Sequence, residues 1–214
     1  MSPRLKRANR PEIPRKTVYR LSVYLRCLQR LKGNNIRTVS SEALAKVAGV
    51  KPTQLRKDLT YFGQFGTRGL GYDVDQLTQM IVDLLGTSSL QPVVLVGVGN
   101  LGAALLAYRG FQQEGFDIVA AFDLEPRPLR GKKTDIPVYP MDQLPEIVRA
   151  QHVKMAMLTV PAAAAQEVTN TLVDCGVTGI LNFAPIVLAV PEDVMVSNVN
   201  LAIELENLSY FIQQ

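Results

Sequence analysis

Hydrophobic residues in the first part of the chain recur at the spacing of an amphipathic helix. Across residues 17–32, leucines and valines follow one another at three- and four-residue steps, and Gly33 ends the pattern. A second, shorter helix is predicted over residues 41–48, with Ser40 as its N-cap. A third begins at Pro52, because proline suits the first helical position. Two short helices joined by a tight turn are typical of the helix-turn-helix motif.

The third helix has two chemically different faces. Leu55, Leu59 and Phe62 fall within about 60° of one another at about 100° per residue, so they form the side that packs into a core. The outer face carries side-chain tips of the kinds that read base edges and hold phosphates. The residues of the outer face and its flank are Thr53, Gln54, Arg56, Lys57, Thr60 and Tyr61. The only acid on this helix, Asp58, is expected nearer the core side.

Residues 63–72 are rich in glycine and flanked by aromatic side chains. Four glycines within nine residues mark tight turns, and such a hairpin directly after a helix-turn-helix predicts the wing of a winged helix. Arg68 is expected near the tip of the wing, facing the DNA backbone or the minor groove. Ser40, at the start of the second helix, completes the candidate DNA contacts.

Charge divides the chain into a basic and an acidic part. Residues 1–72 hold 16 lysines and arginines against three acids, a net charge of +13, whereas residues 73–214 carry −9, for a total of +4. Self-repulsion in so basic a region costs stability unless a polyanion is the partner. Together with the helix-turn-helix pattern, the charge predicts binding of double-stranded DNA, with residues 1–14 as a flexible basic arm.

The second half of the chain begins with a pattern typical of dinucleotide-binding domains. An apolar strand is predicted over residues 92–96, a helix over residues 101–109 and a second strand over residues 118–122, which Asp123 ends. Between the first strand and the helix lies a G-x-G-x-x-G motif made of Gly97, Val98, Gly99, Asn100, Leu101 and Gly102. The motif alone is weak evidence, but an acid 21 residues after its last glycine makes the whole arrangement a strong fingerprint.

Each part of this fingerprint has a physical role. Gly97 permits the tight turn, Gly99 lets a pyrophosphate approach the backbone, and Gly102 lets the helix pack on the strand. The helix N-terminus offers free N–H groups and a positive dipole to the pyrophosphate. Asp123 can accept hydrogen bonds from ribose hydroxyls and opposes a 2′-phosphate, so NAD⁺ and NADH are favoured as cofactors. The alternative is a Rossmann-like domain that binds coenzyme A or no ligand.

Strands and helices continue to alternate toward the C-terminus. Strands are predicted over residues 155–160 and 179–183, with a helix over residues 162–174 between them. Ligands bind beside the carboxyl ends of parallel strands, so residues at these ends are candidate pocket residues. They are Thr159, Pro161 and the segment Asn182, Phe183, Ala184 and Pro185. A last helix over residues 201–214 is so apolar that we expect it to dock on other protein, such as a second subunit.

Composition narrows the chemistry further. Two cysteines far apart and a single histidine, His152, exclude a disulfide framework and argue against a metal site. Unpaired thiols are typical of the cytoplasm, and no segment has the pattern of a secretory signal or a membrane span. Dehydrogenase chemistry needs an acid or base beside the nicotinamide. Histidine and lysine, which often fill this role, are rare in the second half of the chain, so no catalytic residue is expected. A DNA-binding domain joined to a dinucleotide domain without a catalyst predicts a ligand-controlled sensor.

Several segments together carry a resemblance to a known family. They are residues 20–26, 40–42, 56–63, 69–72, 96–102, 158–161 and 179–185. On these segments the chain resembles the Rex family of redox-sensing bacterial transcriptional repressors. The resemblance implies a homodimer that binds operator DNA when NAD⁺ is high and releases it when NADH accumulates. It also implies that the helix over residues 201–214 is exchanged between subunits.

The same resemblance points to a polar switch around the nicotinamide, formed by Arg26, Tyr108 and Asn200. In the family, the position of Asn200 is commonly an aspartate that pairs with the arginine or the tyrosine. A neutral asparagine loses the charge assistance of those bonds, so we expect the switch here to be weaker by about 1 kcal/mol.

These patterns predict an α/β protein with a winged-helix DNA-binding domain, a Rossmann NAD-binding domain and an exchanged C-terminal helix. The expected boundaries are a basic arm at 1–14, the winged helix at 15–86, the Rossmann domain at 87–196 and the C-terminal helix at 197–214. The predicted function is a transcriptional repressor that releases its operator when NADH rises relative to NAD⁺. The alternatives are an NAD-dependent oxidoreductase and a coenzyme A-binding regulator with a DNA-binding domain.

Overall fold

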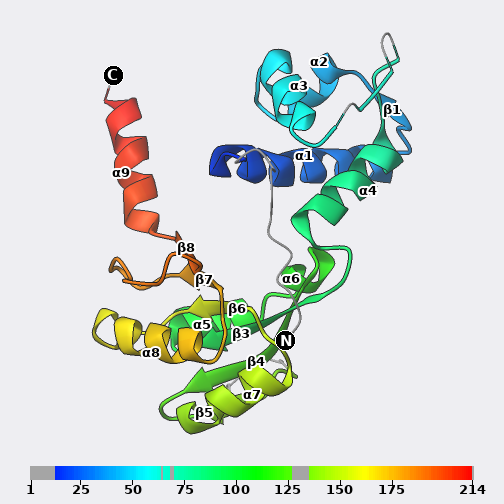
Figure 1. The fold of residues 1–214 in the computed structure, drawn as a ribbon. Coiled ribbons are helices and arrows are strands. Elements are labelled where there is room, and N and C mark those ends of the chain that lie inside the picture. The colour runs from blue at the N-terminus through cyan, green and yellow to red at the C-terminus, as the bar shows by residue number, and fades with distance from the viewer. Residues whose placement is uncertain (1–12, 64, 68–69, 127–134, 214) are drawn as a thin grey trace. The chain divides into compact units, whose positions relative to one another are not determined.

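The computed structural model describes residues 13–63, 65–67, 70–126 and 135–213 of the chain. The chain divides into two compact units, Met1–Ser88 and Ser89–Gln214 (Figure 1). The predicted wing residue Arg68 and all of the predicted basic arm except Ile13 and Pro14 lie outside the described residues.

Helices form most of the first unit, and their sequence signals are local. The first helix buries Leu21, Leu25 and Leu28 on one stripe. Ser40 caps the second helix, because its hydroxyl accepts a hydrogen bond from the N–H of Ala43 at 3.1 Å. The elements of this unit are α1 (Arg15–Gly33), β1 (Thr38–Val39), α2 (Ser41–Val47), α3 (Pro52–Thr60), β2 (Tyr72–Asp73) and α4 (Val74–Leu85).

The fourth helix, α4, is absent from the predicted elements. Its N-cap is Asp73, whose carboxylate accepts a hydrogen bond from the N–H of Gln76 at 2.9 Å. The helix ends at Leu85, and Gly86, with a φ of 72°, caps its C-terminus. Leu77 and Ile81 of α4 join one apolar core with the buried leucines of α1 and α3. The cap is visible in the sequence as an aspartate three residues before a glutamine.

The described residues of the glycine-rich segment, 65–67 and 70–72, form antiparallel pairings. β2 pairs antiparallel with β1, with Tyr72 opposite Val39, and Thr67 forms a single bridge with Gly71. Gly71 has a φ of 84°, and a Cβ there would lie 2.9 Å from the carbonyl carbon of Val39, so only glycine fits. Helices α1, α2 and α3, together with these pairings, confirm the predicted winged-helix unit.

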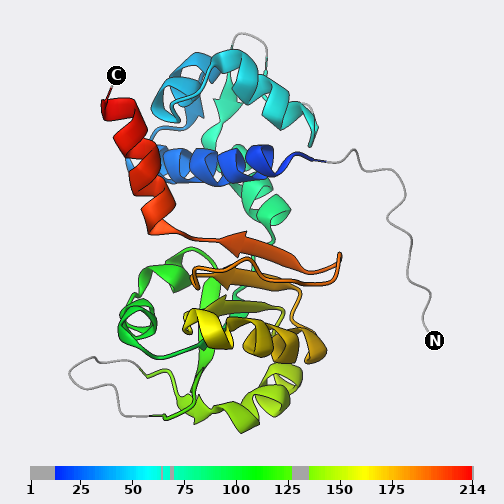
Figure 2. The same cartoon turned by 90° about the vertical axis from the view of Figure 1, so that its left-hand side faces the viewer.

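Six parallel strands form one sheet in the second unit, in the order β5-β4-β3-β6-β7-β8 (Figure 2). The first strand of the unit therefore lies inside the sheet, and the direction of strand addition reverses between β3 and β6. This is the order of doubly wound dinucleotide-binding domains, and it confirms the predicted Rossmann fold. The elements are β3 (Gln91–Val96), α5 (Asn100–Leu106), α6 (Gly110–Gln113), β4 (Phe116–Asp123), β5 (Val138–Pro140), η1 (Met141–Gln143), α7 (Leu144–Ala150), β6 (Met155–Leu158), α8 (Ala162–Asp174), β7 (Gly179–Asn182), β8 (Met195–Asn198) and α9 (Leu201–Ile212).

Helices cover both faces of this sheet. On one face α7 and α8 contribute Leu144 and Leu172 to a core with Val94 and Val96, and on the other α5 contributes Leu106. Because both faces are covered, residues 93–96 are all buried, which explains the unbroken apolar run in the sequence.

Several predicted elements are shorter in the structure, and local contacts explain two of them. The helix expected over residues 101–109 ends at Leu106, because the chain turns and the Tyr108 ring lies over Gly110 at the start of α6. The strand expected over residues 155–160 ends at Leu158. Thr159 leaves the strand there, because its hydroxyl bonds the carbonyl oxygen of Gly97 at 2.6 Å.

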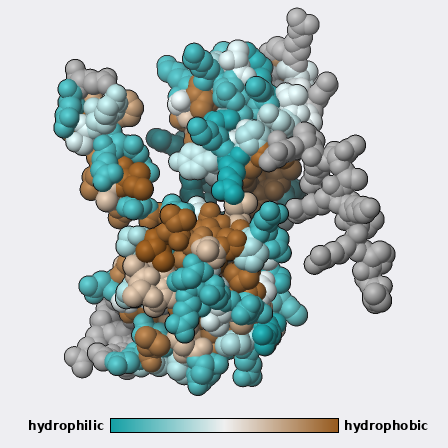
Figure 3. Space-filling view, turned by 60° about the vertical axis from the view of Figure 1, so that its left-hand side comes forward, coloured by the Kyte–Doolittle hydropathy of each residue, from teal (hydrophilic) through white to brown (hydrophobic). Residues whose placement is uncertain are grey.

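The last helix, α9, has an exposed apolar surface. Asn200 caps it, since its side-chain oxygen accepts hydrogen bonds from the N–H groups of Ala202 and Ile203 at 3.0 and 3.4 Å. None of its residues is buried, and Leu201 and Phe211 expose 70% and 71% of their surface. Apolar side chains of the same unit also reach the molecular surface in the space-filling view (Figure 3).

Candidate functional site

The glycine motif forms the turn between β3 and α5. Gly97 has a φ of 98°, and a Cβ there would lie 2.7 Å from the carbonyl oxygen of Thr159. A Cβ on Gly102 would run into the carbonyl oxygen of Gly97 and lie 3.0 Å from Oγ1 of Thr159. Both glycines are therefore required by the packing of α5 against the ends of β3 and β6.

The middle glycine of the motif faces open space. The φ of Gly99 is −72°, a value that any residue adopts, and a Cβ there would meet nothing within 4 Å. Gly99 is the N-cap of α5 and makes no side-chain cap, so the first N–H groups of the helix stay available to a ligand. The absence of a side chain here leaves room at the backbone rather than relieving strain.

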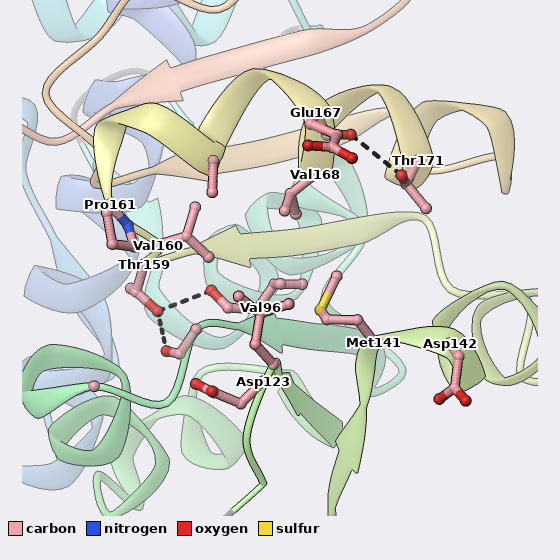
Figure 4. A pocket seen from close by; sticks show the side chains of 14 residues that line it. Val96, Asp123, Met141, Asp142, Thr159, Val160, Pro161, Glu167, Val168 and Thr171 are labelled. Atoms are coloured by element: carbon pink, nitrogen blue, oxygen red, sulfur yellow. Dashed lines mark hydrogen bonds between the residues drawn. The ribbon is translucent and has the colours of Figure 1, made fainter.

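A cavity of about 830 Å³ opens beside this turn, at the carboxyl ends of the central strands (Figure 4). Its lining comes from the ends of β3, β4 and β6, from the residues after β5, and from α8. The described lining residues are Val96, Gly97, Gly99, Asp123, Leu124, Met141, Asp142, Thr159, Val160, Pro161, Ala164, Glu167, Val168 and Thr171. They include three acids and no lysine, arginine or histidine. This lining is mainly apolar with a few polar groups, as expected for a site that takes a small molecule.

Asp123 at the end of β4 is already bonded to the backbone of the glycine turn. Its Oδ2 accepts a hydrogen bond from the N–H of Val98 at 2.6 Å, and its Oδ1 accepts one from the N–H of Glu125 at 3.0 Å. Each carboxylate oxygen has two lone pairs, so both can accept a further bond from a ligand hydroxyl. The carboxylate therefore fixes the turn and faces the cavity at the same time (Figure 4).

The structure brings together only part of the predicted cofactor residues. Gly97, Gly99, Asp123, Thr159 and Pro161 share the cavity. The others lie outside its described lining, although all belong to the same unit: Val98, Asn100, Leu101, Gly102, Tyr108 and Phe183.

Tyr108 lies at a different hollow, of about 320 Å³, and packs edge-on against Phe111 with the ring centres 5.0 Å apart. Phe183 follows β7, and its N–H donates to the carbonyl oxygen of Leu158 at 2.9 Å. Asn182, another candidate, is fully buried and bonds the Asn198 side chain at 2.9 Å, so it stabilises the sheet edge.

Several lining residues are missing from the predicted set. Met141 and Asp142 directly follow the three-residue strand β5, which is too short to stand out in the sequence. From α8, the cavity receives Ala164, Glu167, Val168 and Thr171. Their spacing of three, one and three residues is that of one helix face, a signal that the sequence does contain.

The predicted DNA-reading face lies on α3 as expected. Thr53, Arg56, Lys57 and Thr60 are exposed, whereas Leu55 and Leu59 are buried. Tyr61 and Gln54 on the flank are half-buried, and Ser40 is exposed but engaged as the N-cap of α2.

Arg56 is held by residues of the neighbouring helix. Its Nη1 donates to Oγ of Ser41 at 2.7 Å and forms an ion pair with Oε1 of Glu42 at 3.2 Å. The hydroxyl of Thr60 donates to the carbonyl oxygen of Arg56 at 2.7 Å. The guanidinium is therefore oriented before any ligand arrives, and it stays half-exposed.

The three predicted switch residues belong to different elements. Arg26 is an exposed residue of α1 in the first unit. Tyr108 follows α5 with 60% of its surface exposed, and Asn200 is the N-cap of α9, both in the second unit. The capping role of Asn200 adds a local function that the sequence pattern alone does not single out.

Two further findings concern the described residues as a whole. No helix among them is both long and apolar enough to cross a membrane. Within the same parts of the chain, no group of three or more His, Cys, Asp or Glu side chains is placed to hold a metal ion.

Comparison with known proteins follows the same two-part division. A family model described as "CoA binding domain" matches residues 88–186, and one described as "Putative DNA-binding protein N-terminus" matches residues 12–60. A protein named redox-sensing transcriptional repressor Rex, from Carboxydothermus hydrogenoformans, is 48% identical over 203 residues, which cover 95% of this chain and 98% of the relative.

Solved structures are similar over nearly the whole chain. A crystal structure of RSP in complex with β-NAD⁺ and operator DNA has a TM-score of 0.87 at 34% identity, covering 94% of this chain and 93% of the other. A crystal structure of RSP with β-NADH has a TM-score of 0.83 at 32% identity, covering 94% and 95%. With its winged-helix unit and its doubly wound sheet, this chain belongs to the Rex family of redox-sensing transcriptional repressors.

Proposed function

We propose that this protein is a repressor that binds operator DNA through its first unit and senses the NADH/NAD⁺ ratio through its second. The observation that carries the proposal is the open backbone at Gly99, beside a cavity of about 830 Å³ at the carboxyl ends of the central strands. A dinucleotide pyrophosphate fits such a turn, because the backbone N–H groups can approach it closely. Crystal structures of the similar protein RSP, one with β-NAD⁺ and operator DNA and one with β-NADH, support the assignment.

The residues proposed to bind the dinucleotide are those of the glycine turn and its surroundings. The pyrophosphate would lie on the backbone from Gly97 to Gly102, and Asp123 would accept hydrogen bonds from the adenosine ribose. Thr159 and Pro161 would line the far side of the turn. We assign Tyr108 to the nicotinamide end by family resemblance alone. Phe183 is a proposed cofactor contact because it follows the carboxyl end of β7. Neither residue lines the described cavity.

The proposed DNA contacts are the exposed side chains of α3 and the wing. Arg56 and Lys57 would contact bases or phosphates. Arg68, in the predicted wing, would contact the DNA backbone or the minor groove. The excess charge of residues 1–72 supports a polyanionic partner. Loss of a phosphate contact lowers affinity for all sequences, whereas loss of a base contact relaxes specificity.

NADH rather than NAD⁺ is proposed to oppose DNA binding. The two forms differ only in the charge and planarity of the nicotinamide, so the discrimination must arise there. Moving a population from 1:99 to 99:1 requires about 5.5 kcal/mol of differential affinity, which a dimer can divide between two sites. Arg26, Tyr108 and Asn200 are the proposed polar groups of this switch.

A titration tests the proposal directly. A DNA duplex selected by the protein from a random pool in the presence of NAD⁺ serves as operator. Binding is then measured at fixed total NAD(H) while the NADH fraction is raised. We expect release of the duplex as NADH increases. Equal competition by NAD⁺ and NADH would contradict the proposal.

A coenzyme A-binding regulator is the second candidate, because a model of that name matches residues 88–186. The described lining of the cavity has Asp123, Asp142 and Glu167 but no cation, which disfavours a ligand carrying an additional phosphate on its ribose. Competition of coenzyme A with NADH distinguishes the two. Displacement of NADH by equimolar coenzyme A would favour the second candidate.

We infer that the protein is a regulator rather than an oxidoreductase. Its single histidine, His152, lies in the turn before β6, at the amino ends of the strands, whereas the cavity lies at their carboxyl ends. Relatives named as repressors support this inference. Steady reduction of NAD⁺ by a panel of small alcohols and hydroxy acids would overturn it. A cytoplasmic location follows from the proposed role on chromosomal DNA.

We further propose that the functional form is a homodimer in which α9 is exchanged. The supporting observation is the exposed apolar surface of α9, including Leu205 at 66% and Leu208 at 60%. A two-fold dimer would present two copies of α3 to the two halves of an operator.

A further inference from the structure

The side of α3 that faces away from its outer surface carries a fully buried carboxylate. The side chain of Asp58 is 0% exposed, and its two oxygens receive hydrogen bonds from four side chains. Carboxylates are almost never fully buried unless they are paired, so these four donors are what allow Asp58 to lie in the core.

Three of the four partners lie on one face of α1. Arg20 reaches both oxygens, with Nε 2.5 Å from Oδ2 and Nη2 2.7 Å from Oδ1. The hydroxyl of Tyr24 donates to Oδ2 at 2.8 Å, and that of Thr17 donates to Oδ1 at 3.3 Å. Residues 17, 20 and 24 follow each other at helical spacing, so a single stripe of α1 provides all three donors.

The fourth partner is Gln54, one turn earlier on α3. Its Nε2 donates to Oδ1 of Asp58 at 2.8 Å. Gln54 therefore presents its amide toward the buried carboxylate, although it belongs to the flank predicted to contact DNA. Burial raises the pKa of Asp58, but the hydrogen bonds from Arg20, Tyr24 and Gln54 outweigh it and lower the pKa below its ordinary value, so the cluster holds an anion.

The geometry of the cluster links it to the reading face. At about 100° per residue, Asp58 lies about 160° around α3 from Arg56, so an anchor on one side sets the direction of the other. The bidentate contact with Arg20 resists rotation of α3 about its own axis, because both carboxylate oxygens are fixed at once. Apolar contacts of Leu55 and Leu59 tolerate small rotations more easily, because they are not directional.

We propose that Asp58, held by Arg20 and Tyr24, is a positioning residue that fixes the rotation of α3 and thereby the specificity of operator recognition, and that Gln54 acts in this cluster rather than as a base reader. The inference rests on the proposed DNA-binding function. Buried ion pairs add little net stability but are retained in some proteins because they specify one geometry.

The test compares operator affinity with affinity for an unrelated duplex in the full-length protein. Tyr24→Phe removes one donor to Asp58 without changing charge or volume much. We expect it to reduce the ratio of operator to non-specific affinity by about tenfold, as for a weakened base contact. Affinity for NADH, measured without DNA, should stay unchanged because the second unit is untouched.

Matched variants control for general effects. Tyr19→Phe alters a tyrosine on the same helix that is 73% exposed, and Asp83→Asn alters the exposed Gln79–Asp83 pair, which has the same four-residue spacing on α4. Both should keep the ratio of the unmodified protein. Asp58→Asn should lower the ratio at least as much as Tyr24→Phe, and if it fails to fold, Tyr24→Phe still decides.

The outcomes separate this inference from the proposed function. If the unmodified protein binds no duplex, the proposed function fails. If it binds but Tyr24→Phe lowers operator and non-specific affinity equally, or neither, the positioning role of the cluster is wrong. Gln54→Ala should weaken binding to the operator and to each of its single-base variants by the same factor. A loss of discrimination at one base position would instead make Gln54 a reader.

Discussion

Charged and polar side chains of α3 and α9 serve two tasks at once. Arg56 is oriented by Ser41 and Glu42 on the outer side of α3, while Asp58 is bound by α1 on the inner side. Asn200 caps α9 and occupies the position assigned to the switch. A substitution at one of these positions can therefore change the local hydrogen bonds, the proposed DNA or NADH response, or both. Measuring stability and binding on the same variant separates the two effects.

The buried carboxylate predicts how acid affects the first unit. The pKa of Asp58 is lowered in the folded state, so its stabilising contribution is present above the unfolded pKa of about 4 and is lost as pH falls toward the folded value. Asp58→Asn should be less stable at neutral pH by about 2 kcal/mol, because Arg20 loses an ionic partner. Thermal unfolding followed by circular dichroism from neutral to acid pH should show that difference shrinking. A constant difference would contradict the assignment.

Asn200→Asp tests the switch while keeping the cap. Aspartate caps a helix as well as asparagine does, and its charge suits the N-terminal dipole of α9, so stability should not fall. If Asn200 belongs to the switch, the NADH concentration that releases half of the operator should change by a different factor from the NADH affinity measured without DNA. If neither quantity changes, Asn200 acts only as a helix cap.

The turn between β3 and α5 shows how one element combines fold and binding. Gly97 and Gly102 are needed because other backbone atoms occupy the space of a Cβ, whereas Gly99 faces open space. Glycine is therefore present for different reasons within one motif: for packing at Gly97 and Gly102, and for ligand access at Gly99. Substitutions should separate the two reasons.

Alanine at two of these positions should give opposite phenotypes. Gly102→Ala should destabilise the second unit, because its Cβ would meet the Gly97 carbonyl oxygen. Gly99→Ala should change the free energy of unfolding by less than about 1 kcal/mol but weaken NADH binding by about 1–3 kcal/mol, since the methyl group would occupy the approach of the pyrophosphate. Thermal unfolding and a fluorescence titration with NADH measure the two effects. Unchanged NADH affinity in Gly99→Ala would exclude this turn as the pyrophosphate site.

At the scale of the whole molecule, α9 exposes leucine, isoleucine and aromatic side chains that the described chain does not cover. Burying such a surface stabilises by about 25 cal/mol per Å², so a partner surface is expected. We predict that Leu205→Asn combined with Leu208→Asn shifts the protein toward monomers in sedimentation experiments and weakens operator binding.

Polar positions of the same helix provide the control. Glu206→Gln and Ser209→Ala should leave the oligomeric state as it is in the unmodified protein. If the leucine variants sediment like the unmodified protein, α9 does not form the subunit contact.

Local patterns alone were sufficient for much of the fold and part of the site. The helical spacing in α1, the N-cap at Ser40 and the proline that begins α3 act over a few residues, so the sequence determines them directly. The strand, glycine turn and terminal acid of the second unit are similarly local, and the structure places Gly97, Gly99 and Asp123 in one cavity.

Only the tertiary structure decided which distant residues meet. Asp58 and Arg20 are 38 residues apart, and no local pattern shows that a buried carboxylate on α3 is neutralised from α1. The cavity wall from Glu167 and Thr171 likewise depends on how α8 packs on the sheet. Short-range propensity and periodicity determine elements, whereas the pairing of buried charges and the lining of a cavity arise from packing between elements far apart in the chain.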